Sequence, residues 1–239
     1  MDRLSGVEER LDGSLDDPGA LAGNLRDLAR VNRWLGGIRL SVTGIERLAP
    51  GNDPLTILDI GTGGGDIPLA LIDHGRATGR HITVAAIDER PEVLTAAVRS
   101  TPRLATTGEL TLHVGDGRAL PYPDDAFDIA HCSLLLHHLE PGEARLVLGE
   151  MRRVARLGVV VNDLVRGRRN WLGAWLLGHT LTRNPYTRHD APLSVRRAYA
   201  VTELTKLVTA AGLRVERTMT DPLRHRVMLA ARRTGKAAT

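Results

Sequence analysis

The sequence has a single cysteine, few aromatic residues and almost no lysine. With Cys132 alone among 239 residues, a disulfide framework and a cysteine-based zinc site are excluded, and we expect no bound metal. No segment approaches about 18 consecutive apolar residues, and the start of the chain is too charged for a signal peptide. We therefore expect no membrane span and a cytoplasmic location.

Only two of the 32 basic residues, Lys206 and Lys236, are lysines, and 28 acidic residues are interspersed with the arginines. The net charge of +4 therefore does not by itself indicate a nucleic-acid-binding protein. The densest basic cluster, Arg166, Arg168 and Arg169, could contact phosphate, although a solvated face is the simpler interpretation. The length and the 42% hydrophobic content fit one large α/β domain with a small cap.

Residues 1–50 are expected to form a helical N-terminal cap. Apolar residues recur at helical spacing over residues 4–11, 21–35 and 38–48. These apolar helices are compatible with a homodimer.

Residues 51–239 alternate between short apolar runs and helical patterns. Such alternation predicts βαβ units and a mostly parallel sheet with helices on both faces. Residues 164–200 interrupt the alternation and are expected to form a helical insertion that breaks at Asn184-Pro185. The last strand is expected to be antiparallel, and the last nine residues are expected to fray. The expected strands are residues 55–60, 81–87, 110–114, 127–132, 157–162, 213–217 and 225–230.

A glycine-rich turn follows the first expected strand, in the run Asp59-Ile60-Gly61-Thr62-Gly63-Gly64-Gly65-Asp66. Glycine lets a ligand approach the backbone, and the N-terminus of the next helix offers free N–H groups. A dinucleotide-binding turn would place a glycine where Asp66 stands, and Asp66 would repel a pyrophosphate. The turn therefore suits a cationic ligand without phosphate, or it is a plain tight turn of a packed core.

Acidic residues follow the next two expected strands. Asp88 could accept two hydrogen bonds from a ribose diol, and Asp116 could accept one from the exocyclic amine of adenine. Taken alone, each of them could also belong to an ordinary loop.

Together these motifs resemble the class I S-adenosylmethionine (SAM)-dependent methyltransferases. The resemblance covers residues 55–163, through the runs ILDIGTGGGDIPLAL, AAIDERPEVLTAA, VGDGRALPYPDDAFDIAHCSLLLHHL and VVVNDL. It implies a Rossmann-like sheet, SAM as the cofactor and S-adenosylhomocysteine as the product. The cofactor-binding residues that it implies are Asp59, Gly61, Gly63 and Gly65 for the methionine part, Asp88 for the ribose, Asp116 and Gly117 for the adenine, with Thr62, Glu89 and Ser133 beside them. One departure is that the family's usual Lys-Pro-Gly-Gly turn before the fifth strand is absent.

The flanking segments 24–37 and 189–197 are similar to bacterial methyltransferases that act on polyketide- or quinone-like phenols. This similarity implies a methyltransferase of secondary metabolism that methylates oxygen, or a nucleophilic ring carbon, of a small phenolic or quinol-type metabolite. An RNA methyltransferase is an alternative, although Cys132-Ser133-Leu134-Leu135 stands where base-amine methylation normally shows an Asn/Asp-Pro-Pro-aromatic turn. A SAM-binding partner without catalysis and, least favoured, a nicotinamide dehydrogenase are the remaining alternatives.

The candidate catalytic residues follow the fourth expected strand, at the sheet edge where parallel sheets bind their ligands. His137 and His138 are candidate bases for a phenol hydroxyl because histidine titrates near neutral pH, or one of them is only structural. His189 beside Asp190 is a further candidate, although Asp190 could instead cap a helix.

The insertion and the cap hold most of the aromatic residues, which suits a lid over a flat ligand. Trp171 and Trp175, four residues apart, are expected to pack this lid against the core. The candidate substrate contacts are Trp34, Asp163 and Arg196.

Overall fold

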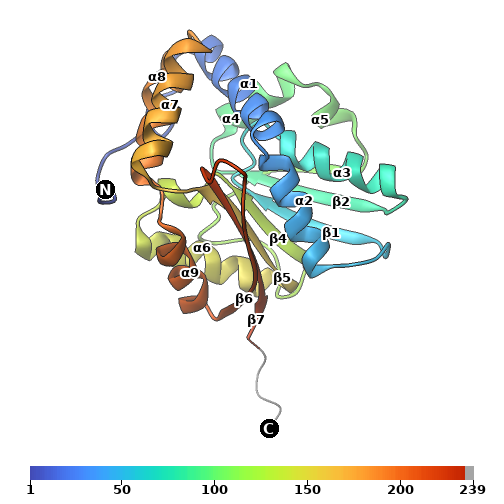
Figure 1. Ribbon diagram of the computed structural model, residues 1–239. Coiled ribbons are helices and arrows are strands. Elements are labelled where there is room, and N and C mark those ends of the chain that lie inside the picture. Colours follow the sequence, from blue (N-terminus) through green and yellow to red (C-terminus); the bar gives the residue numbers. More distant parts are fainter. Residues whose placement is uncertain (235–239) are drawn as a thin grey trace.

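The computed structural model describes residues 1–234 and shows a seven-stranded sheet covered by helices (Figure 1). The strand order is β3-β2-β1-β4-β5-β7-β6, and neighbours are parallel except where β7 takes part. The expected mostly parallel sheet with an antiparallel last strand is thus confirmed. The strands are β1 (Leu55–Ile60), β2 (Ile82–Asp88), β3 (Leu110–Val114), β4 (Phe127–Ser133), β5 (Ala155–Leu164), β6 (Leu213–Thr220) and β7 (Arg226–Arg233).

Two of the helices, α1 and α8, begin at recognisable capping signals. The Asp17 side chain accepts the N–H of Ala20, and Asn184 does the same for Tyr186 and Thr187, in each case just before a proline that begins the helix. The helices are α1 (Pro18–Trp34), α2 (Gly37–Leu48), α3 (Asp66–Thr78), α4 (Pro91–Ser100), α5 (Arg103–Thr106), η1 (Leu136–His138, 3-10), α6 (Pro141–Val154), α7 (Arg168–Thr180), α8 (Pro185–Arg197) and α9 (Val201–Ala210).

Each face of the sheet buries its own hydrophobic core. The helices α1 to α5 cover one face, with Leu21 and Leu40 among the buried residues, and α6 and α9 cover the other with Leu148 and Leu204. Strands that are covered on both faces read as continuous apolar runs, which is why their residues could be recognised in the sequence.

The absent Lys-Pro-Gly-Gly turn is replaced by a direct junction. Helix α6 ends at Val154 and β5 begins at Ala155, with an irregular register between β4 and β5 before Gly158. A side chain at Gly158 would overlap the carbonyl oxygen of Ala231 on β7. Glycine therefore lets the strand pass close to its neighbour without the usual loop.

The helix expected over residues 4–11 is wrong. Residues 1–16, which we call the N-terminal strap, contain no helix. Their backbone groups bond to distant partners instead: Leu4 N–H donates to the carbonyl of Arg196, and Arg10 and Leu11 N–H donate to the Asp190 carboxylate. An eight-residue apolar pattern is too short to offset helix nucleation, so these long-range contacts decide its conformation.

The expected packing of Trp171 and Trp175 is also wrong, because both side chains lie on the exposed side of α7, at 36% and 41% exposure. Of the last nine residues expected to fray, residues 231–233 continue β7 and residues 235–239 lie outside the described part. Among the described residues, no helix is long and apolar enough to cross a membrane.

Candidate active site

The glycine loop after β1 has a backbone that other residues would strain. Gly61, Gly63 and Gly65 have φ angles of 69°, 54° and 68°. A Cβ on Gly65 would lie 2.5 Å from Leu104, and one on Gly61 would lie 2.9 Å from Leu135. The loop is therefore held close to the core and presents its backbone at the carboxyl edge of the sheet.

Asp88, at the end of β2, organises this loop. Its Oδ2 accepts the N–H of Gly63 at 2.9 Å and its Oδ1 accepts the N–H of Arg90 at 3.1 Å. Burial raises the pKa of the carboxyl. Each carboxylate oxygen retains one acceptor site, so a diol could still bind.

Asp116 and Glu89 gather around Arg118. The Arg118 guanidinium bonds to Asp116 at 2.9 Å and lies 3.3 Å from Glu89. The hydrogen bond from Arg118 lowers the pKa of Asp116. A Cβ on Gly117 would lie 2.8 Å from Ile60, so only glycine fits there.

Two hydroxyl groups at the same edge lack partners. Thr62 Oγ1 and Ser133 Oγ are buried, and neither has a hydrogen-bond partner among the described residues. Thr62 follows β1 and Ser133 ends β4, and these two strands are adjacent and parallel, with Ile60 paired to Cys132. Buried hydroxyls without partners are costly, so these two fit a site that is completed by a polar ligand.

Asp59 lies deeper than a direct ligand contact requires. It is 3% exposed, and its Oδ1 lies 2.6 Å from His131 Nδ1. His131 Nε2 is 2.8 Å from Ser41 Oγ, which also accepts a hydrogen bond from Asn162. Asp59 thus joins β1 to β4, β5 and α2 through a buried polar network.

Asp66, at the start of α3, is tied to the cap. Its Oδ2 accepts a hydrogen bond from Asn32, whose Oδ1 accepts one from the fully buried Arg226. Burial lowers the pKa of Arg226 to about 10. Asp66 stands where a dinucleotide-binding turn would have a glycine. It contacts α1 directly and β7 through Asn32.

His137 and Asp163 form a buried pair at the carboxyl ends of β4 and β5. His137 Nδ1 lies 2.6 Å from Asp163 Oδ1, and Asp163 Oδ2 accepts the N–H of His137. Burial alone would favour a neutral Asp163, but the neighbouring His137 lowers its pKa. The pair leaves His137 Nε2 as the ring nitrogen that faces away from Asp163.

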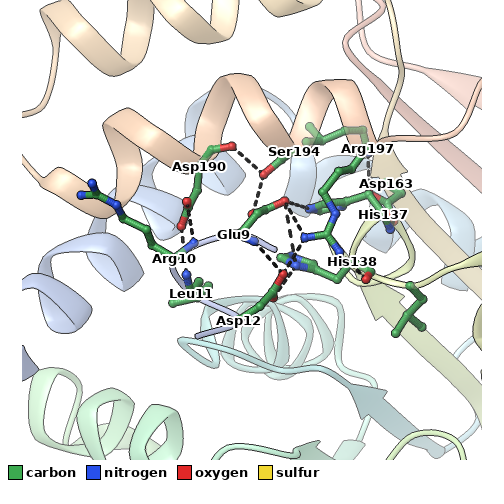
Figure 2. A network of polar contacts seen from close by, with 12 residues as sticks. Glu9, Arg10, Leu11, Asp12, His137, His138, Asp163, Asp190, Ser194 and Arg197 are labelled. Carbon is green, nitrogen blue, oxygen red and sulfur yellow. Dashed lines mark hydrogen bonds and ion pairs between the residues drawn. The ribbon is translucent and has the colours of Figure 1, made fainter. Parts of the chain in front are cut away.

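The N-terminal strap lies over this pair (Figure 2). Glu9 Oε1 is 4.0 Å from His137 Nε2 and 4.0 Å from His138 Nδ1, and Asp12 lies 2.8 Å from His138. Arg197 of α8 binds Asp12 and the carbonyl of His138. Burial opposes protonation of His138, but Glu9 and Asp12 outweigh it and raise its pKa to about 9.

Glu9, His137 and His138 also place three possible metal ligands within 4.8 Å of one another. The Arg197 guanidinium lies 3.7 Å from the same Glu9 oxygen, and His138 is protonated at neutral pH. Positive charges inside the cluster favour ion pairs over a bound cation.

The other predicted residues do not join this cluster. His189 contacts Asp190 at 2.7 Å, but 44% of its side chain is exposed. Asp190 does not cap α8, since it lies inside the helix and binds the strap. Trp34 is 77% exposed, and Arg196 is exposed beside the buried Arg197.

A hollow of about 400 Å³ opens behind the glycine loop, among α1, α3 and α4. Gly64 and Asp66 are part of its lining, but Asp88, Asp116 and His137 are not. Because this hollow lacks these predicted site residues, we place the candidate site instead at the sheet edge, where the glycine loop, Asp88 and Ser133 converge.

Several residues of the site were missed in the sequence. The strap residues Glu9 and Asp12 are separated from His137 by more than 120 positions, and no local pattern indicates the contact. The pair Arg196-Arg197 stood out in the sequence with Arg196 as the expected substrate contact, whereas the structure places Arg197 in the cluster. Arg118 is the residue that the sequence could have indicated, because it directly follows the motif Gly115-Asp116-Gly117.

Known proteins share the domain and the fold. A family model described as a methyltransferase domain matches residues 57–158. The ubiquinone/menaquinone biosynthesis C-methyltransferase UbiE of Rickettsia akari is 38% identical over 72 residues, which cover 30% of this chain and 29% of the relative. The match to this curated relative thus spans less than a third of its length.

Solved structures extend the similarity across most of the chain. Human N-acetylserotonin methyltransferase in complex with SAM has a TM-score of 0.66 at 18% identity, over 91% of this chain and 56% of that chain. A SAM-dependent methyltransferase from Aquifex aeolicus has a TM-score of 0.63 at 20% identity, over 90% and 97%. Residues 57–158 therefore match a methyltransferase domain, and the chain has the fold of these SAM-dependent methyltransferases.

Proposed function

We propose that this chain is a SAM-dependent methyltransferase of secondary metabolism in the cytoplasm. It transfers a methyl group to oxygen, or to a nucleophilic ring carbon, of a small phenolic, polyketide- or quinol-type metabolite. The observation that carries the proposal is the buried His137–Asp163 pair at the carboxyl ends of β4 and β5. Leu135, two residues before His137, lies against the position of Gly61, so the pair is close to the glycine loop.

In this proposal the cofactor is held by the residues around the loop. Asp88 accepts the ribose hydroxyls, Asp116 and Gly117 receive the adenine, and Thr62 and Ser133 gain the partners that they lack. The cofactor supplies a methyl group activated by a sulfonium. The protein then contributes mainly position and a site without bulk water, and alignment can lower the barrier by roughly 7–11 kcal/mol.

His137 acts as the base for a hydroxyl acceptor. Asp163 holds the proton on Nδ1, which leaves Nε2 free to take the proton of a phenol. Nε2 lies 4.0 Å from Glu9 Oε1, so we infer that an acceptor hydroxyl takes the place of the Glu9 carboxylate. A positioned base of this kind typically contributes about 10²–10⁴-fold to the rate.

The named relatives support a small-molecule acceptor, because one is a ubiquinone/menaquinone C-methyltransferase and another is an N-acetylserotonin methyltransferase. In the test, purified protein and methyl-labelled SAM are incubated with a panel of phenols and quinols, with RNA, and with protein. We expect label in the organic-extractable phenols. Label in RNA would replace the proposal with the nucleic-acid alternative, and bound SAM without any transfer would favour a binding partner.

The base is tested on the labelled phenol with His137→Ala and Asp163→Asn. Both variants should lower kcat by about 10²-fold or more while the Kd for SAM stays within a few-fold. His81→Ala, which alters an exposed histidine before β2, is the matched control and should behave like the native protein. Full turnover in His137→Ala would show that His137 is not the base.

A further inference from the structure

Helix α7 turns apolar side chains toward solvent. Trp171, Leu172, Trp175 and Leu176 are 36%, 49%, 41% and 46% exposed. Their spacing of one, three and one residues places all four on one side of the helix. We call these four residues the α7 face.

The last turn of α7 attaches the helix to α8. Gly178 is buried, and a Cβ on it would lie 3.5–3.9 Å from Thr187, Arg188 and Ala191 of α8. Gly178 therefore packs on α8, whereas the four large apolar side chains of the α7 face stay partly exposed to solvent. Figure 1 shows α7 and α8 at the outer edge of the molecule, away from the sheet.

The surroundings of the α7 face are positively charged. Residues 164–189 contain five arginines and no aspartate or glutamate. Arg168, Arg169 and Arg183 are exposed, and none of them forms an ion pair within the part of the chain that the structure describes. The turn before β7 adds Leu223, which is 70% exposed, and is joined to α7 by a hydrogen bond from Asn170 to the carbonyl of Arg224.

The charges around the α7 face favour an anionic binding partner over a second copy of this chain. In a two-fold dimer built on this face, the same arginines would approach each other without an acidic partner. The exposed side chains of the α7 face can enter a deformable lipid layer, whose anionic headgroups complement the arginines. Tryptophan, leucine and flanking arginine are the composition of helices that lie in a membrane interface.

We propose that the α7 face binds the surface of an anionic phospholipid membrane. The four apolar side chains enter the boundary between headgroups and acyl chains, and Arg168, Arg169 and Arg183 contact lipid phosphates. The helix lies on the membrane rather than across it, since no described helix is long and apolar enough to span. This inference does not depend on the proposed methyl acceptor.

The test is co-sedimentation of the full chain with vesicles of phosphatidylcholine alone or with about one third phosphatidylglycerol. We expect binding to the anionic vesicles, little binding to the neutral ones, and release by high salt. Arg168→Gln with Arg169→Gln should weaken partitioning about 30-fold. Leu172→Gln with Leu176→Gln should weaken it at least tenfold.

The matched control is Arg145→Gln with Leu146→Gln, an exposed basic and apolar pair on α6, which should bind as the native chain does. Insertion is read from tryptophan fluorescence in Trp34→Phe, whose remaining tryptophans are Trp171 and Trp175. Anionic vesicles should shift this emission to shorter wavelength. Equal binding to both vesicle types, or no binding by correctly folded protein, would overturn the proposal, as would a stable dimer that Leu172→Gln with Leu176→Gln dissociates.

Discussion

Raising the pH should release the ion pair that holds the N-terminal strap over the candidate site. Asp12 lies 2.8 Å from His138, and Arg197 binds the same carboxylate. Burial opposes the charge on His138, but Glu9 and Asp12 raise its pKa from 6.5 to about 9. The carboxyl of Asp12 has a lowered pKa through the same contacts, so it stays ionised throughout this range.

Whether a rise in pH stabilises or destabilises the fold depends on which state, folded or unfolded, holds the proton on His138 more tightly. The folded chain holds the proton on His138 up to a pKa of about 9, whereas the unfolded chain loses it near 6.5. The stabilisation is therefore complete below the unfolded pKa and disappears as the pH rises through 9. At about 1.4 kcal/mol per pKa unit, the loss between pH 6.5 and pH 10 is about 3 kcal/mol.

The assay is urea unfolding of the native chain and His138→Gln at closely spaced pH values. The difference between the two removes the contribution of the other titrating groups, and His81→Gln serves as the control. The native chain should lose about 3 kcal/mol more than His138→Gln across this range. A ring pKa near 6.5 for His138, measured by NMR in the native chain, or parallel pH profiles for the two proteins, would refute the reasoning.

Three further predictions concern the loop and its support. Asp88→Asn should weaken SAM binding about tenfold or more, because a charge-assisted hydrogen bond contributes about 1.5–3 kcal/mol, and unchanged affinity by calorimetry would contradict the ribose assignment. Gly65→Ala should lower the unfolding free energy by about 1–3 kcal/mol, since it combines a φ of 68° with a 2.5 Å approach to Leu104, and a native-like urea midpoint would count against it. His131→Ala should lower the unfolding free energy by about 3–5 kcal/mol, because it leaves Asp59 buried without its partner. An unchanged urea midpoint would show that Asp59 does not depend on the His131 ring.

Local patterns were sufficient for the central sheet. The strand expected at 110–114 matches β3 at both ends, because an apolar run bounded by charge and glycine leaves few alternatives. The order of the glycine loop, Asp88 and Asp116 along the chain was also readable, since each follows directly from a strand end.

Contacts between segments that are distant in the sequence could not be predicted from local patterns. Residues 4–11 have helical spacing, yet Leu4 and Leu11 bond through their backbones to α8, more than 170 positions away. Trp171 and Trp175 have the spacing of a buried helix face, but it is the small Gly178 that packs on α8. In each case a periodic pattern specifies which side chains share a face and leaves open what that face meets.

The polar network around Asp59 shows why the site depends on the N-terminal helices. A carboxylate buried at the end of β1 requires a partner, which His131 provides, and the orientation of His131 is set by Ser41 of α2. Asn32 of α1 likewise binds Asp66 directly after the glycine loop. The N-terminal strap, which precedes α1 and α2 in the sequence, covers His137. Because these contacts meet both the cofactor loop and the candidate base, the position of the N-terminal segment determines the geometry of each.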